Sequence, residues 1–243
     1  GMECAAFGFN LDFAPVADVR SNPENTVIGD RAYSGDPGRA ADAAAWVDGG
    51  MREAGIISVW KHFPGHGNTA TDSHQALPVV ELSREDWARG DAVPFRRAVE
   101  CGAPAVMAGH IRMTAFDPEY PASLSHVLVS EVLREELGFT GVVCTDDLTM
   151  GAISDTYGMG EAAVLAVEAG CDLLLVCHGA DNLTQARQAL LGAVDGGRIS
   201  PARLEESVYR ILALKAEYGL TNQTVEAPDV AALNQAVQAL LGE

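Results

Sequence analysis

Short apolar segments alternate along this chain with longer amphipathic segments, and this alternation constrains the fold more than any other feature. The apolar segments are continuous runs rather than apolar–polar alternations, which is typical of parallel strands buried on both faces. Strands that alternate with helices form a parallel sheet covered by helices. We therefore expect an α/β fold with strands at residues 11–16, 56–60, 105–108, 142–145 and 173–177.

The segments between these strands carry start and stop signals for helices. Asp36 is a candidate N-cap before Pro37, and Ser83 with Asp86 resembles a capping box. Gly170 follows an apolar helical pattern and is a natural helix stop. The expected helices cover residues 37–54, 84–99, 127–137, 161–169, 183–194, 201–218 and 229–241. The last of these places four apolar residues on one face: Val230, Leu233, Val237 and Leu240.

The composition is that of an acidic globular protein. The 243 residues are 48% hydrophobic and 21% charged, with a formal net charge of −18. Such a chain repels phosphate backbones and anionic lipids, so we expect neither nucleic acid nor a membrane as a partner. No apolar run reaches the roughly 18 to 20 residues of a transmembrane helix. The five cysteines form no metal or disulfide pattern, and we expect them to be reduced thiols.

Polar residues gather where each predicted strand ends. In a parallel α/β fold the carboxyl ends of the strands share one face, and ligands bind there. Five strands that all deliver polar side chains to one rim indicate a binding or catalytic site. These residues are Asp18 and Arg20, Lys61 and His62, His110 and Arg112, Asp146 and Asp147, and His178 and Asp181.

The segment KHFPGHGNTATDSH, residues 61–74, allows three interpretations. A solvated turn would not need Lys61 and His62 at the end of a strand. A metal site could use His62, His66, Asp72 and His74 as ligands, although Lys61 would repel a cation. A catalytic loop could use the carboxylate of Asp72 to orient the His74 imidazole as a general acid and base.

A second segment, VVCTDDLTM at residues 142–150, ends a predicted strand with two adjacent acids. One of them could simply cap the helix that follows. Neighbouring side chains of a strand point to opposite sides, so one carboxylate can face the site while the other braces the loop. A carboxylate fixed at a strand end is a candidate nucleophile.

Together these segments resemble the glycoside hydrolases of family 3. KHFPGHG with the following DSH, and TDDLTM, carry the resemblance, and FAPVADV, IGDRAYSGDP, PASLS, LREELGFTGVV and AGCDLLLVC extend it from about residue 8 to residue 218. The similarity is closest to the bacterial β-N-acetylglucosaminidase branch, which acts in peptidoglycan recycling. The resemblance implies a retaining glycosidase with Asp146 as nucleophile, His74 as acid/base and Asp72 as its partner. It also implies that Arg31, Lys61 and His62 bind the sugar, and that no metal or cofactor takes part.

The resemblance implies a (β/α)8 TIM barrel, of which only about five βα units are present here. No segment matches the acidic DQEGGR motif of the family, and the chain begins inside the helix before the FAPVADV strand. We expect residues 2–220 to form a partial barrel and residues 221–243 a helical extension. An incomplete barrel leaves two sheet edges open, so we expect a dimer or larger oligomer.

The expected substrates are N-acetylglucosaminides such as muropeptide fragments. Two other interpretations stay open, a catalytically weak or inactive remnant that associates, and a metal-dependent hydrolase that uses the histidine-rich loop. The cytoplasm is the expected compartment, with export as the alternative.

Overall fold

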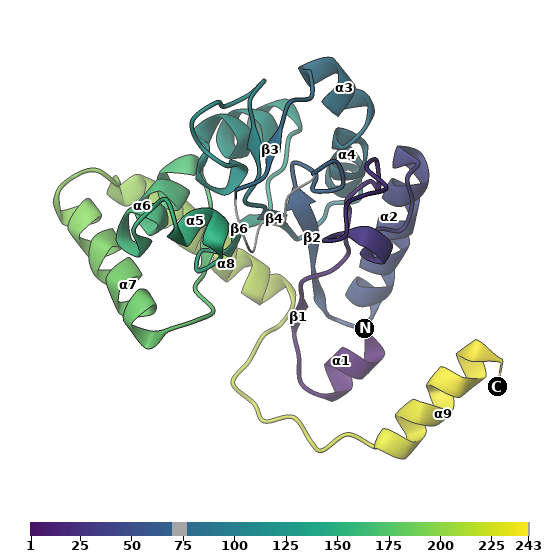
Figure 1. Ribbon diagram of the computed structural model, residues 1–243. Helices are drawn as coiled ribbons and strands as arrows, with labels where there is room; N and C mark the ends of the chain where they lie inside the picture. The colour runs from purple at the N-terminus through teal and green to yellow at the C-terminus, as the bar shows by residue number, and fades with distance from the viewer. Residues whose placement is uncertain (70–76, 243) are drawn as a thin grey trace.

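A parallel sheet of five strands forms the centre of the molecule (Figure 1). The computed structural model describes residues 1–69 and 77–242. The strands follow the chain order β1-β2-β4-β6-β7, and every pair is parallel. Their bounds are Leu11–Asp12 for β1, Ile57–Phe63 for β2, Ala105–Ala108 for β4, Val142–Asp147 for β6 and Leu173–Leu175 for β7. The sheet curls as part of a barrel does, which confirms the predicted incomplete α/β barrel.

Helices connect successive strands and cover the convex face of the sheet (Figure 1). The helices before β6 are α1 Met2–Ala6, η1 Gly29–Arg31, α2 Pro37–Glu53, α3 Arg84–Arg89, α4 Ala92–Glu100, η2 Ala122–Leu124 and η3 Val127–Glu136, the last wound as a π-helix. The helices after β6 are α5 Gly151–Ser154, α6 Met159–Ala169, α7 Ala180–Asp195, α8 Pro201–Glu217 and α9 Val230–Leu241.

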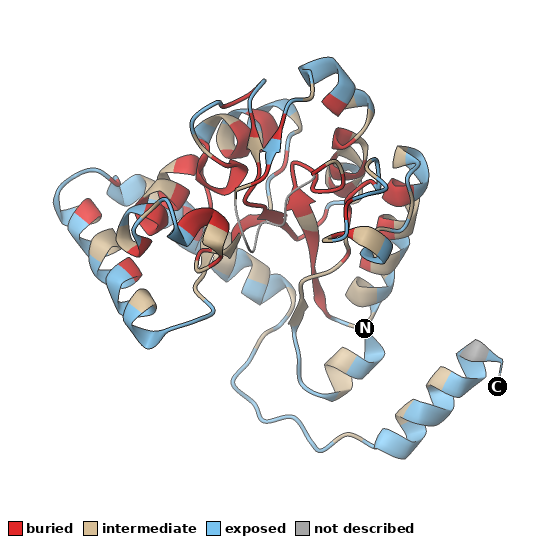
Figure 2. Ribbon diagram, viewed as in Figure 1, coloured by how far each residue is buried: buried red, intermediate tan, exposed pale blue. Residues whose placement is uncertain are grey.

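The two faces of the sheet take part in two different apolar clusters. Trp60, Val106 and Val143 pack with the surrounding helices in the main core. Met107 and Cys144 belong to a smaller cluster on the other face, which α8 covers with apolar side chains, among them Ile211 and Leu214. This division follows from the alternation of side chains along a strand. The buried residues accordingly lie along the strands and the inward sides of the helices (Figure 2).

The predicted caps form. The Asp36 side chain accepts a hydrogen bond from the Arg39 amide at 2.8 Å and begins α2. The Ser83 hydroxyl accepts one from the Asp86 amide at 3.1 Å and begins α3. Gly170 ends α6 with φ +118°, a conformation that favours glycine.

The structure corrects several predicted boundaries. The helix expected over residues 84–99 is two helices, α3 and α4, which are separated at Gly90 and Asp91. Strand β2 extends to Phe63, so Lys61 and His62 lie within the strand rather than after it. Strand β1 is only two residues long, although Val16 still bridges Lys61. A second small sheet, formed by β3 Val79–Val80 and β5 Arg112–Met113, was not predicted because two-residue strands carry no periodicity.

Asp172 joins α8 to the sheet. Its fully buried carboxylate accepts hydrogen bonds from Arg134 at 2.6 Å, Arg210 at 3.0 Å and the Ser207 hydroxyl at 2.7 Å. It also accepts one from the Val143 amide of β6 at 3.0 Å. A buried carboxylate needs such partners, and here they come from three separate elements.

Helix α9 follows an extended segment and is exposed along most of its length (Figures 1 and 2). Asp229 caps it by accepting from the Ala232 amide at 3.0 Å. Val230 and Leu240 of its predicted apolar face are 51% and 78% exposed. The division at residue 220 stays a prediction. Within residues 1–69 and 77–242, no helix is both long and apolar enough to cross a bilayer.

Candidate active site

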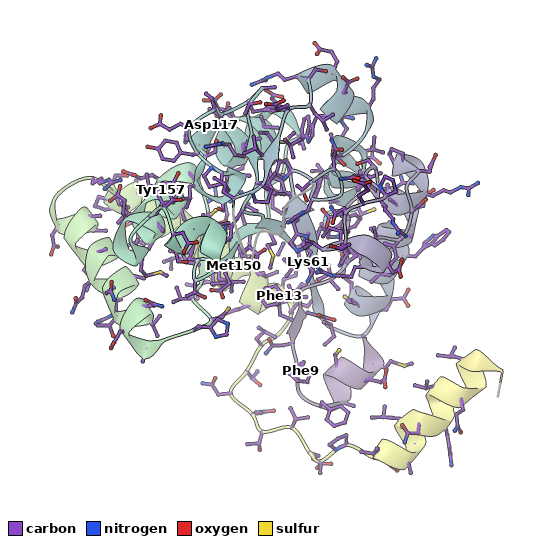
Figure 3. The ribbon with its side chains drawn as sticks, viewed as in Figure 1. Phe9, Phe13, Lys61, Asp117, Met150 and Tyr157 are labelled. Atoms are coloured by element: carbon purple, nitrogen blue, oxygen red, sulfur yellow. The ribbon has the colours of Figure 1, made fainter. Side chains whose placement is uncertain are left out.

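A cavity of about 240 Å³ opens at the carboxyl ends of the strands. Arg31, Lys61, His62 and Asp146 all line it, so four of the six predicted site residues surround one space. Apolar side chains complete the wall, among them Phe13, Met107, Met150 and Leu175. In Figure 3, Lys61, Phe13 and Met150 lie together near the centre of the molecule, where the strands converge.

Lys61 stands on β2 as a half-buried ammonium group. Burial and the nearby Arg31 guanidinium lower its pKa, and the charge of Asp146 opposes them. The peptide bond between Lys61 and His62 is cis, and both side chains line the cavity. The cavity therefore brings the Lys61 ammonium and the Arg31 guanidinium close to the Asp146 carboxylate.

Asp146 and Asp147 end β6 and have different surroundings. The Asp147 carboxylate accepts hydrogen bonds from the Thr149 amide at 3.0 Å, the Thr149 hydroxyl at 2.5 Å and the Cys177 amide at 3.0 Å. Burial raises the pKa of Asp147, but these hydrogen bonds outweigh it and hold the pKa below its usual value. Among the described residues, the Asp146 carboxylate accepts a hydrogen bond only from the Asp147 amide, at 2.8 Å. Asp147 thus holds the segments after β6 and β7 together through Thr149 and Cys177, and the Asp146 carboxylate is available to a ligand in the cavity.

Arg31 ends the short helix η1 in the segment between β1 and α2. This segment is tied to the histidine-rich loop through Asn25, whose side-chain amide donates to the His66 carbonyl at 2.8 Å and to the Thr69 hydroxyl at 3.2 Å. The Asn25 side chain also accepts from the Ile28 amide at 2.9 Å. These contacts bring Arg31 to the cavity although it is far from β2 in sequence.

Asp18 and His66 were not predicted to be catalytic or to bind the sugar, although His66 was a candidate metal ligand, and both lie at the site. Asp18 is fully buried and accepts from His62 Nδ1 at 2.7 Å. His66 lines the cavity and is 2% exposed. Burial lowers the pKa of His66, against the charge of Asp18. The sequence did mark Asp18 as a polar residue near a strand end, but nothing local identifies its partner.

Asp91 packs against Gly65, near the start of the histidine-rich loop. Asp91 is 4% exposed, and its Oδ1 atom has no hydrogen-bond partner within residues 1–69 and 77–242. Burial and the charge of Asp18 raise its pKa to about 7. Gly65, at φ +123°, packs directly on it, since an added methyl group would lie 2.6 Å from Asp91 Cβ.

Asp72 and His74 lie outside the described residues, so the predicted acid/base pair has no structural description here. The metal-site interpretation also depended on them. Among the described residues, no group of three or more His, Cys, Asp or Glu side chains could hold a metal ion.

The fold and the position of the cavity define the class of protein. The curled parallel sheet with its site at the carboxyl ends of the strands is the arrangement of barrel-type α/β proteins. Residues 1–214 match the family model of the glycosyl hydrolase family 3 N terminal domain. The chain belongs to glycoside hydrolase family 3, which confirms the predicted resemblance.

Individual relatives agree with this assignment. A beta-hexosaminidase of Nitrosomonas eutropha is 33% identical over 238 residues, which cover 97% of this chain and 68% of that protein. A beta-hexosaminidase of Alkalilimnicola ehrlichii is 43% identical over 177 residues, which cover 72% and 50%. The solved structure of a family 3 beta-N-acetylglucosaminidase from Paenibacillus sp. str. FPU-7 is 45% identical with a TM-score of 0.90. It covers 93% of this chain and 44% of that chain, so the present chain spans about half the length of such relatives.

Proposed function

We propose that this chain carries the catalytic residues of a retaining glycosidase that removes terminal β-linked N-acetylglucosamine. Its substrates are N-acetylglucosaminides such as the muropeptide fragments of peptidoglycan recycling. The names of the relatives support this proposal, because they are beta-hexosaminidases and a beta-N-acetylglucosaminidase.

The proposed reaction has two steps. The Asp146 carboxylate attacks the anomeric carbon, and His74 gives its proton to the leaving glycosidic oxygen. In the second step His74 takes a proton from water, which attacks the same carbon and releases Asp146. Asp72 orients the His74 imidazole. Retaining glycosidases normally use two carboxyl groups, and here an Asp–His pair replaces one of them.

One observation carries the proposal: Asp146 shares a single cavity with Arg31, Lys61 and His62. A nucleophilic carboxylate must be ionised and must stand beside groups that hold the sugar. The ammonium of Lys61 and the His62 ring can bind hydroxyl groups, and Arg31 extends the polar wall. The apolar side chains of Phe13 and Met150 can pack against the faces of the sugar ring.

The test is turnover of a chromogenic N-acetylglucosaminide by the purified chain and by Asp146→Asn. We expect turnover by the wild type and its loss in the variant, because the amide cannot form the glycosyl ester. Asparagine has nearly the same size and shape as aspartate, and unfolding curves of the two proteins serve as the control for folding. A folded wild type that turns over no N-acetylglucosaminide would favour the second interpretation, a non-catalytic domain that associates. Activity lost with a chelator would favour the metal-dependent alternative.

We also propose that two or more copies associate. Strand β1 pairs only with β2, and β7 only with β6, within the described residues, so each has an edge without a partner strand. Leu183 and Leu191 on α7, and Leu212 on α8, are 60%, 52% and 57% exposed. Exposed edges and apolar side chains of this kind favour association. A monomer by light scattering at micromolar concentration would contradict it.

The cytoplasm is the compartment we propose. The five cysteines are free thiols, which supports a reducing environment. Fractionation of the native host would test this, and recovery outside the cytoplasm would favour export.

A further inference from the structure

The Asp18 carboxylate is hydrogen-bonded to both ends of the turn between His62 and His66. Its Oδ1 atom accepts hydrogen bonds from the backbone amides of His62 at 3.2 Å and His66 at 2.6 Å. Its Oδ2 atom accepts from Nδ1 of the His62 ring at 2.7 Å. The Asp18 side chain is 0% exposed. A carboxylate so fully removed from water persists only where it is well hydrogen-bonded, and these three contacts meet that need.

The contact with Asp18 determines which nitrogen of His62 carries its proton. An ionised carboxylate only accepts hydrogen bonds, so the neutral ring must be protonated at Nδ1. Its Nε2 atom is then an acceptor. His62 lines the cavity and its Nδ1 is held by Asp18, so among the residues that the structure describes Nε2 is the nitrogen available to a ligand. A sugar hydroxyl is a suitable donor for it.

Electrostatics keep Asp18 in the form that this arrangement requires. Burial alone would raise the pKa of Asp18, but the neighbouring rings of His62 and His66 and the hydrogen bonds from them lower it below its usual value. Asp18 is therefore ionised at neutral pH. His62 and His66 also meet edge to face, with ring centroids 5.7 Å apart, so the ring that Asp18 orients also packs against the next one in the loop.

We propose that Asp18 is a positioning residue that fixes His62 in the tautomer whose Nε2 accepts a hydrogen bond from a hydroxyl of the bound sugar. This role rests on the proposed function, since it names the group through which His62 recognises the substrate. Asp18 itself does not touch the substrate. It acts through the ring and the backbone of the turn.

Asp18→Asn separates the contact with the His62 ring from the contacts with the backbone amides of His62 and His66. The asparagine Oδ1 atom can still accept from both backbone amides, which preserves the turn. Its Nδ2 group replaces an acceptor by a donor, so the His62 ring must accept at Nδ1 and carry its proton at Nε2. The matched control is Asp48→Asn. Asp48 is also buried, at 2% exposed, and accepts from Ser58 and from Trp60 Nε1, but it does not line the cavity.

The first readout requires no turnover. Long-range ¹H–¹⁵N spectra of histidine-labelled protein at pH 8 report the tautomer of each ring, and His62→Gln assigns the signal. We expect the Nδ1-protonated form in the wild type and in Asp48→Asn, and the Nε2-protonated form in Asp18→Asn. Adding N-acetylglucosamine should shift the Nε2 signal of the wild type. A wild-type ring protonated at Nε2 would overturn the proposal, even if Asp18→Asn failed to fold.

The second readout is steady-state kinetics on the chromogenic N-acetylglucosaminide. Asp18→Asn should raise KM about tenfold, the effect of losing one hydrogen bond to a hydroxyl, and change kcat less. Asp48→Asn should leave KM unchanged. A purely structural role for Asp18 would instead lower the active fraction and so kcat, with KM and tautomer unchanged, and would overturn the proposal. A wild type that shows the expected tautomer but no turnover would refute the proposed function alone.

Discussion

The protonation of Asp91 makes a sharp prediction about stability. The pKa of this buried carboxyl is about 7, whereas its ordinary value is 3.8. Between these two pH values the folded protein binds a proton that the unfolded chain has released. Stability therefore falls as pH rises from about 4 to 7, because unfolding releases this proton and a higher pH favours its release. Asp91→Asn keeps the shape of the neutral side chain and removes the ionisation.

The magnitude follows from the difference between the two pKa values. A difference of about three pH units corresponds to about 4 kcal/mol of unfolding free energy between strongly acidic and neutral pH. Between 2 and 3 kcal/mol of it, roughly, falls between pH 5 and pH 8. The free energy of unfolding of Asp91→Asn minus that of the wild type should thus rise by this amount over that interval.

Urea unfolding of both proteins at pH 5, 6, 7 and 8 measures the difference directly. Other titrating groups affect wild type and variant alike and cancel in the subtraction. Equal m-values are the control, since they show that both proteins expose the same surface on unfolding. A difference that stayed constant within about 0.5 kcal/mol over this range would show that Asp91 is not held protonated, and would refute the reasoning.

Other variants test the core, the α8 contact and the cavity. Phe95→Ala removes a fully buried ring that packs edge to face on Phe63 at 5.2 Å, and should cost about 3–5 kcal/mol in urea unfolding; a loss below about 1 kcal/mol would contradict this packing. Asp172→Ala leaves Arg134 without its carboxylate and should also cost about 3–5 kcal/mol, and a neutral effect would show that water replaces that partner. Lys61→Met should lower kcat/KM at least about tenfold by removing a charged hydrogen-bond donor, without lowering the melting temperature; unchanged kinetics would remove Lys61 from the site.

The strands of the sheet could be predicted well from the sequence, because the signals that mark a strand lie within the strand and in the residues next to it. Each strand is an apolar run, and the polar residues that follow it mark the face where the cavity opens. Lys61, His62 and Asp146 were found in this way, and the structure places them around one cavity. The helix over residues 84–99 was not divided correctly, although the sequence carries local signs of a break: α3 ends at Gly90, and Pro94, which has no backbone N–H, lies in the first turn of α4.

The rest of the site depends on contacts between distant parts of the chain. Asp18 lies 44 residues before His62, and the β-bridge between Val16 and Lys61, which continues the pairing of β1 with β2, brings them together. The raised pKa of Asp91 depends on burial against Gly65 and on the charge of Asp18, neither of which is visible in its own neighbourhood. Pairing and burial of this kind are set by the tertiary fold.

Trapping the glycosyl–enzyme tests the central claim most directly. A 5-fluoro N-acetylglucosaminyl fluoride forms the covalent intermediate faster than water releases it, and peptide mass spectrometry locates the sugar. The account predicts one added sugar on the peptide that contains residues 142–150, at Asp146, and none in Asp146→Asn. A sugar attached to another residue, or turnover that leaves Asp146 unmodified, would contradict it.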